Sequence, residues 1–300
     1  MPVQVHPTLR VPTDEQRAAI DHRGGALRVL GAPRTGKTET AVAIVLDRVR
    51  RQELTTDQVL LLAGTREAAA GLRRRIMVEL GGTATTPVAR TASSLAFGIL
   101  RQRAGLLGDP PPRLLNGPEQ DVVIRDLLAG HASGEVEGPA WPDRVVGALG
   151  TRAFRAELRD LLMRAVENDL GAADLLELAE RYEVPEWAAC ADLLEEYDRV
   201  TALATPGAYD PAWIVAAAAQ AIAEDPALAS AVRGELRLIV VDDAQELTAG
   251  SARLLATIAA IPSPAPLDIV LLGDPDTSVQ SFRGADPGIL GGASGAPVDW

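Results

Sequence analysis

The sequence predicts an α/β fold: a parallel sheet with helices on both faces, interrupted by an inserted all-helical region. Short apolar runs alternate with helical patterns near both ends of the chain. This alternation is typical of parallel strands joined by right-handed crossover helices. The stretch from 118 to about 225 shows only helical periodicity. Hydrophobic residues make up 47% of the 300 residues, which is enough to bury a large core.

The first part of the sheet is expected to begin after a capped helix. Thr13 and Gln16 have the spacing of a capping box, in which each side chain bonds the backbone N–H of the other residue. Strands and helices then alternate, in the order strand 26–30, helix 36–51, strand 59–63, helix 67–80, weak strand 86–89 and helix 93–103.

A proline-rich break at 108–112 ends this pattern, and helical periodicity follows, broken at 130–141, Gly171, Pro185 and Pro206. A strand at 236–241, a helix at 249–261 and a strand at 267–272 complete the predicted sheet. The predicted domains are therefore 1–105 and 226–290 for the two parts of the sheet domain, 106–225 for the helical insertion and 291–300 for a loose tail.

Composition excludes several classes of protein. One cysteine, Cys190, and three histidines exclude an internal disulfide and argue against a cysteine- or histidine-rich metal site. No stretch reaches the roughly 18 apolar residues of a membrane span, and the first residues lack the apolar block of a signal peptide. We therefore expect a soluble, cytoplasmic chain without a membrane partner.

Charge is distributed unevenly along the chain. The net charge is −12, yet residues 1–103 carry 16 basic and 9 acidic side chains, a net of +7. A basic segment in an acidic protein suggests a polyanionic partner, although an arginine-rich helix face is more often simply solvated.

The segment 31–38 carries the clearest chemical signal. It fits the phosphate-binding pattern G-x-x-x-x-G-K-[ST] between a predicted strand and helix, and Lys37 is the only lysine of the chain. Backbone N–H groups of such a loop surround phosphates, the lysine reaches the β and γ oxygens, and the hydroxyl holds Mg²⁺. The sequence therefore predicts ATP and Mg²⁺ as ligands. The predicted ATP-binding residues of the loop are Gly31, Ala32, Pro33, Arg34, Thr35, Gly36, Lys37 and Thr38. Arg34 stands where a small residue would relax the backbone.

Two carboxylates follow the apolar strand 236–241. Alone, Asp242 and Asp243 would suggest a turn or a helix cap. With a phosphate loop on what we expect to be an adjacent strand, they suggest a catalytic edge of the sheet. We predict that Asp242 shares the metal with Thr38, and that Asp243 is the general base that activates water.

Further motifs follow the order found in one family of enzymes. They are Thr13–Arg17 with Gln16, Gly64–Ile76 with Thr65 and Arg75, Arg90–Ala96 with Thr91, and Gly273–Asp286 with Thr277, Phe282 and Arg283. With these motifs the chain resembles the N-terminal ATP-binding region of UvrD/Rep-like superfamily-one DNA helicases, which include RecB-like and AdnAB-like motors. The resemblance covers nearly the whole chain as one RecA-like lobe with its helical insertion.

The resemblance implies a role for each motif. Gln16 would read adenine, Thr277 would sense the γ-phosphate, and Arg283 would bridge the nucleotide and the acidic strand end as a catalytic residue beside Lys37 and Asp243. The residues expected to contact single-stranded DNA are Thr65, Arg75, Thr91 and Phe282. The implied activity is ATP hydrolysis coupled to 3′–5′ movement on single-stranded DNA, in repair or recombination.

Departures from the family pattern leave alternatives open. The family usually has Glu where this chain has Asp243, and often Gln where it has Thr277. No further strand–helix pairs follow Arg283, so we expect a second motor lobe or a partner helicase/nuclease subunit to supply the arginine finger. The 300 residues alone are expected to bind ATP–Mg²⁺ and hydrolyse it poorly. The alternatives are a catalytically weakened regulatory or binding subunit, and an ATPase that acts on something other than nucleic acid.

Overall fold

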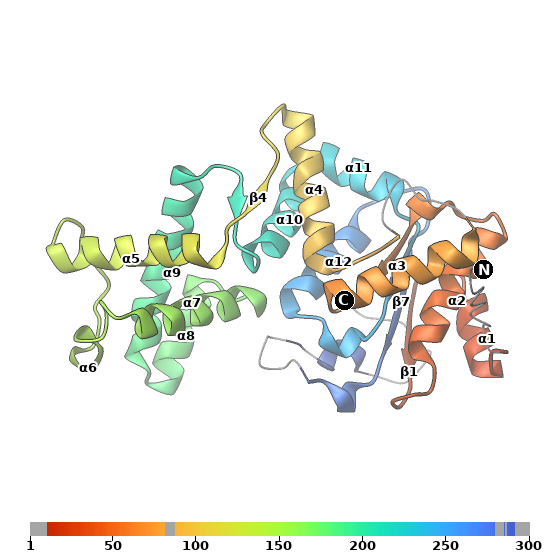
Figure 1. Ribbon diagram of the computed structural model, residues 1–300, viewed down its shortest axis with the longest axis horizontal. Coiled ribbons are helices and arrows are strands. Elements are labelled where there is room, and N and C mark those ends of the chain that lie inside the picture. Colours follow the sequence, from red (N-terminus) through yellow and green to blue (C-terminus); the bar gives the residue numbers. More distant parts are fainter. Residues whose placement is uncertain (1–10, 82–87, 280–284, 286, 292–300) are drawn as a thin grey trace, which may run out of the picture. The chain divides into compact units, whose positions relative to one another are not determined.

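The central element is a five-stranded sheet in which every pair of neighbours is parallel. The computed structural model describes residues 11–81, 88–279, 285 and 287–291. The strands, in spatial order, are β1 (Ala26–Leu30), β7 (Asp268–Gly273), β6 (Leu238–Val241), β2 (Val59–Leu62) and β3 (Ala89–Arg90). The predicted α/β fold with a parallel sheet is confirmed (Figure 1).

Helices cover the sheet on both faces. Every residue of β2, β6 and β7 is buried, and a strand with alternating side chains is buried throughout only when both faces are covered. The helices that begin in or belong to this part of the chain are α1 (Asp14–Asp21), α2 (Lys37–Arg50), α3 (Arg66–Leu80), α4 (Ala92–Leu107), α11 (Pro226–Glu235) and α12 (Ala249–Ala260). In Figure 1, α1 and α2 lie on the same side of the sheet, and residues of α3 share a core cluster with α2.

A core cluster of the sheet unit lies between α2 and the sheet. Ala41, Val42 and Val45 of α2 have no exposed surface, and they pack with alternate residues of the strands such as Leu61 and Val240. This packing fixes the start of α2 relative to the strand ends, since each valine, leucine or isoleucine side chain buried here contributes about 1.5–3 kcal/mol.

Strand order corrects one expectation. β1 does not neighbour β6, because β7 pairs with both of them and lies between. The loop after β1 must therefore pass the end of β7 to reach the acidic residues. Gly31 N donates to Gly273 O at 3.1 Å at that crossing, and a Cβ on Gly273 would lie 2.7 Å from Gln245 Oε1. The absence of a side chain at Gly273 leaves room for this close approach.

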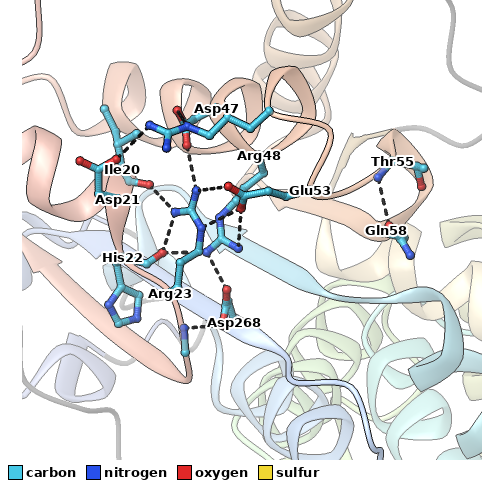
Figure 2. A network of polar contacts seen from close by, with 12 residues as sticks. Ile20, Asp21, His22, Arg23, Asp47, Arg48, Glu53, Thr55, Gln58 and Asp268 are labelled. Carbon is cyan, nitrogen blue, oxygen red and sulfur yellow. Dashed lines mark hydrogen bonds and ion pairs between the residues drawn. The ribbon is translucent and has the colours of Figure 1, made fainter.

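Polar contacts tie α2 to the amino-terminal ends of the strands (Figure 2). Arg48 Nη2 lies 2.6 Å from Asp268 Oδ2, with both side chains almost fully buried, and the same nitrogen donates to His22 O at 2.7 Å. Arg23 pairs with Glu53 at 2.8 Å and with Asp47 at 3.0 Å. This network lies at the amino-terminal ends of the strands, because Asp268 is the first residue of β7. The loop after β1 lies at the opposite, carboxyl-terminal ends.

The chain divides into two compact units, taken over the described residues. The sheet unit contains residues up to 95, 222–248 and those from 252 on, and the helical unit contains 96–221 and 249–251. The helical unit holds α5 (Gly117–Ser133), α6 (Asp143–Val146), α7 (Arg152–Glu167), α8 (Ala172–Tyr182), α9 (Pro185–Ala204) and most of α10 (Trp213–Glu224). The predicted domain boundaries stay a prediction, and the predicted tail lies outside the described residues except for Gly291.

The helical unit follows the predicted breaks. Gly171 caps α8 and Pro185 is the first residue of α9. One expectation is wrong: the stretch is not purely helical, because β5 (Ala208–Tyr209) pairs in parallel with β4 (Arg113–Leu114). Two-residue strands carry too little periodicity to be recognised in sequence.

The core of this unit contains the lone cysteine. Cys190 is buried among leucines of α5, α7 and α9, and burial raises the pKa of its thiol to about 12. The group therefore acts as a small apolar side chain. None of the described helices combines the length and the hydropathy needed to cross a membrane.

Candidate functional site

The loop between β1 and α2, residues 31–38, has a tightly constrained backbone. Gly36 caps α2 with a φ of +92°, and a Cβ at this position would lie 2.7 Å from Gln16 Nε2. Both the backbone conformation and the space therefore require glycine. Arg34 has a φ of +67°, a left-handed conformation that costs a non-glycine residue about 1–2 kcal/mol.

Lys37 lies across the loop. Its Nζ donates to Gly31 O at 2.7 Å and to Ala32 O at 3.1 Å. The ammonium group is thus held at the start of α2, where the unpaired N–H groups of the helix also carry partial positive charge. This part of the site is suited to a polyanion.

The loop meets the acidic end of β6 directly. Thr38 Oγ1 donates to Asp242 Oδ1 at 3.2 Å, although the two residues are far apart in sequence. Asp242 is 6% exposed, and its pKa is raised to about 6, first by burial and then by the negative charge of Asp243. A cation bound beside this carboxylate would favour its charged form.

Asp243 is held by its neighbours in an uncommon conformation. Its φ is +53°, which Asp tolerates better than most residues. Gln245 Nε2 donates to Asp243 Oδ1 at 3.3 Å, and Gln245 Oε1 accepts from Asp274 N at 3.0 Å. Gln245 therefore connects the ends of β6 and β7. Its role was not predicted, since only the carboxylates of this segment carried a chemical signal.

A cavity of about 470 Å³ opens over the loop. Its lining brings together the start of α2, the acidic strand end and the segment after β7, namely Pro33, Arg34, Gly36, Lys37, Thr38, Glu39, Arg75, Asp243 and Thr277. Thr277 Oγ1 donates to Asp274 O at 3.1 Å. Most of the residues predicted to bind phosphate, Thr277 and Asp243 thus face one space.

Gln16 lies at the other side of the loop. Its Nε2 donates to Thr35 O at 3.0 Å, and its Oε1 accepts from Thr13 N at 3.1 Å, which completes the predicted capping box. A second cavity of about 680 Å³ is lined by Gln16, Lys37, apolar residues of β1 and part of α1. Lys37 lines both cavities, so they meet at the loop.

Two of the four predicted DNA contacts follow neighbouring strands. Thr65 comes after β2 and accepts from Ala68 N at 3.1 Å, and Thr91 comes after β3 and accepts from Ser94 N at 3.2 Å. Because β2 and β3 are paired, these helix starts share the carboxyl edge of the sheet. Phe282 and Arg283 lie outside the described residues.

Arg75 lies elsewhere. Its guanidinium forms an ion pair with Glu39 in the first turn of α2 and lines the cavity over the loop. Arg73 and Arg74 on the same helix are exposed. Glu39 was not singled out by any pattern, because a carboxylate in the first turn of a helix is common.

A magnesium ion fits the oxygens that meet here. The Thr38 hydroxyl and the Asp242 carboxylate are hard donors, and Mg²⁺ commonly binds to one or two carboxylates together with substrate phosphates. Among the described residues no group of three or more His, Cys, Asp or Glu side chains could hold a metal. The fit is therefore to a cation that arrives with phosphate oxygens.

The fold defines a RecA-like α/β class: a phosphate-loop pattern follows β1, and acidic residues follow β6. The chain belongs to the UvrD/REP helicase N-terminal domain family, whose model matches residues 12–295. The family resemblance inferred from the motifs is therefore confirmed.

Known relatives are DNA helicases. The chain is 24% identical over 280 residues to the ATP-dependent DNA helicase UvrD1 of Mycobacterium leprae, which covers 90% of this chain and 34% of the relative. UvrD1 of Mycobacterium tuberculosis is 23% identical over 279 residues, with the same coverage. A 67-residue stretch is 42% identical to an ATP-dependent helicase/nuclease subunit of Exiguobacterium sibiricum, covering 22% of this chain and 6% of that protein. The chain spans about a third of the length of its UvrD1 relatives.

Proposed function

We propose that this chain forms the ATP- and Mg²⁺-binding lobe of a UvrD-like DNA helicase or translocase. One observation carries the proposal: Thr38 of the loop contacts Asp242 at 3.2 Å across the end of the intervening strand. The phosphate-loop pattern and the acidic pair are thereby parts of one site, which hydrolysis of a nucleoside triphosphate requires.

Each residue around the cavity would have its own role in binding or hydrolysing ATP. Lys37, which now bonds two loop carbonyls, would turn to the β and γ oxygens of ATP. Thr38 and Asp242 would hold Mg²⁺, which neutralises charge on those oxygens when bound. Asp243 would accept the proton of the attacking water, and Gln245 would keep its carboxylate in place. Thr277, which lines the same cavity, would contact the γ-phosphate.

The adenine ring of ATP would lie on the Gln16 side of the loop. Support comes from the second cavity, which has Gln16 at its wall and mostly apolar neighbours, as an aromatic base prefers. Gln16 would exchange its bond to Thr35 for the adenine edge. Arg283 would bridge the nucleotide and the acidic strand end, as the resemblance implies.

Single-stranded DNA would lie along the carboxyl edge of β2 and β3, at Thr65 and Thr91, with Phe282 as a stacking platform. The UvrD1 relatives are ATP-dependent DNA helicases, which supports this partner. We further propose movement in the 3′–5′ direction, a role in repair or recombination, and a second motor lobe or partner subunit that supplies an arginine finger. Such fingers are worth about 10³–10⁵ in rate.

The Lys37→Ala variant tests the nucleotide site. We expect it to abolish binding of a fluorescent ATP analogue in an equilibrium titration, because the loop pattern places this ammonium group at the β and γ oxygens. Arg50→Ala is the matched control: it removes a cation from the far end of the same helix, where Arg50 pairs with Glu79. Unchanged affinity in Lys37→Ala would refute the proposal.

Binding to a single-stranded oligonucleotide should weaken as salt rises.

A second candidate function is a catalytically weakened regulatory or binding subunit. Asp243 favours it, because its side chain is shorter than the Glu that the family usually has at this position. The left-handed backbone of Asp243 and its short side chain together set how far the carboxylate reaches into the cavity. A misplacement of about 1 Å can cost roughly a hundredfold in rate. Single-turnover hydrolysis in the complete assembly separates the two: a large gain in Asp243→Glu supports the weakened subunit, and a loss supports Asp243 as the working base.

A further inference from the structure

The ion pair between Glu39 and Arg75 lies in the lining of the cavity over the loop. Glu39 is two residues beyond Lys37 in the first turn of α2, and Arg75 reaches it from α3. Their side chains are 32% and 27% exposed. Both line the cavity that also holds Lys37, Thr38 and Thr277.

The neighbours of Arg75 make its placement informative. Arg73 and Arg74 are exposed, whereas Arg75, the next residue of the helix, is partly buried. Its guanidinium is thus withdrawn from the general basic surface and joined to one carboxylate. Guanidinium groups bind carboxylates and phosphates with the same paired geometry. The Glu39 carboxylate therefore stands in for an anion of similar shape.

The lining of the cavity indicates which phosphate would compete. The loop pattern assigns Lys37 and Thr38 to the β and γ phosphates and their Mg²⁺, and Asp243, Thr277 and Arg75 complete the lining beyond the loop. A diphosphate would fill the loop and leave the space beside these three side chains free. The terminal phosphate of a triphosphate would enter the space that Arg75 shares with Thr277.

We propose that Arg75 binds the terminal phosphate of ATP and that Glu39 holds it in the empty site. The proposal rests on the proposed function and adds a rule for discriminating ATP from ADP. Entry of the terminal phosphate exchanges the partner of Arg75 from Glu39 to phosphate. The exchange also gives α3 a direct contact with the nucleotide, and Thr65 at the start of α3 is a predicted DNA contact.

Equilibrium titrations with fluorescent ATP and ADP analogues, both with Mg²⁺, test the proposal on the 300-residue chain. In Arg75→Ala we expect affinity for the ATP analogue to fall about 10- to 100-fold, the range for a lost hydrogen bond to a charged group. Affinity for the ADP analogue should fall by less than about threefold. Arg74→Ala, on the neighbouring exposed residue, should change neither.

Glu39→Gln gives a result that misfolding cannot imitate. Removing the competing carboxylate should raise affinity for the ATP analogue by about fivefold, the scale of a partly exposed ion pair. Equal losses for both nucleotides in Arg75→Ala, or a loss of oligonucleotide binding alone, would overturn the proposal. If Lys37→Ala abolishes ATP binding and Arg75→Ala leaves ATP binding unchanged, the inference about Arg75 fails and the proposed function stands. If the unaltered chain does not bind ATP, both the inference and the proposed function fail.

Discussion

The buried ion pair between Arg48 and Asp268 provides a quantitative test of what holds the sheet unit together. The pair joins the end of α2 to the first residue of β7 at 2.6 Å, and the two side chains are 6% and 8% exposed. Asp268 also accepts from Gly24 N at 2.9 Å, and Arg48 donates to His22 O (Figure 2). We expect each partner to depend on the other for its charge to be tolerated.

The magnitude follows from burial. Removing one partner of a buried pair leaves an uncompensated charge and costs about 3–5 kcal/mol. Arg48→Met keeps most of the aliphatic volume and leaves the Asp268 carboxylate without its cation. Asp268→Asn keeps an acceptor for Gly24 and leaves the guanidinium with Glu53 at 3.8 Å as its nearest carboxylate. Because a domain has only about 5–15 kcal/mol of stability, either loss should be large.

Urea denaturation followed by far-UV circular dichroism measures the change in free energy of unfolding. Three of the four tryptophans lie in the helical unit, so circular dichroism is preferable to tryptophan fluorescence. Arg51→Met is the control: Arg51 is 55% exposed and pairs with Asp21 and Asp47 at the surface, which is worth at most about 1 kcal/mol per pair.

The double variant Arg48→Met/Asp268→Asn completes a thermodynamic cycle. It should lose less than the sum of the two single variants, because no unpaired buried charge remains. The reasoning is refuted if Arg48→Met is no more destabilising than Arg51→Met, or if the single losses simply add.

Two further changes have expected outcomes. Burial raises the pKa of Asp210 to about 6, so the folded state binds a proton that the unfolded state has already released, and stability falls as pH rises from about 4 to 6. Asp210→Asn keeps an oxygen that accepts from Tyr197 Oη, now at 2.5 Å. It should raise the free energy of unfolding at pH 8 by about 2 kcal/mol and make stability less dependent on pH. If the melting temperatures of the variant and the unaltered chain follow the same pH profile, the prediction is wrong. Arg34→Gly should stabilise the fold by about 1 kcal/mol, because glycine adopts the left-handed conformation without strain. The same change should weaken ATP binding, because it removes the Arg34 guanidinium from the lining of the cavity. A lower melting temperature would show that Arg34 is not strained.

Local patterns determined the elements and the residues of the loop. The capping box of Thr13 and Gln16 forms as expected, and the strand 26–30 and the helix after Gly36 begin where the sequence indicates. These features depend on residues a few positions apart, so periodicity, caps and glycine positions are sufficient to predict them.

The spatial partners were decided by tertiary structure. The sequence suggested that the strands before the loop and before Asp242 are neighbours, whereas β7 lies between them. The guanidinium of Arg75 meets Glu39 in the cavity over the loop, a partner that no local pattern indicated, and its contact with DNA stays a prediction. Strand order and helix crossing arise from packing between segments that are distant in the chain, and a local pattern contains no information about which distant side chain it will meet.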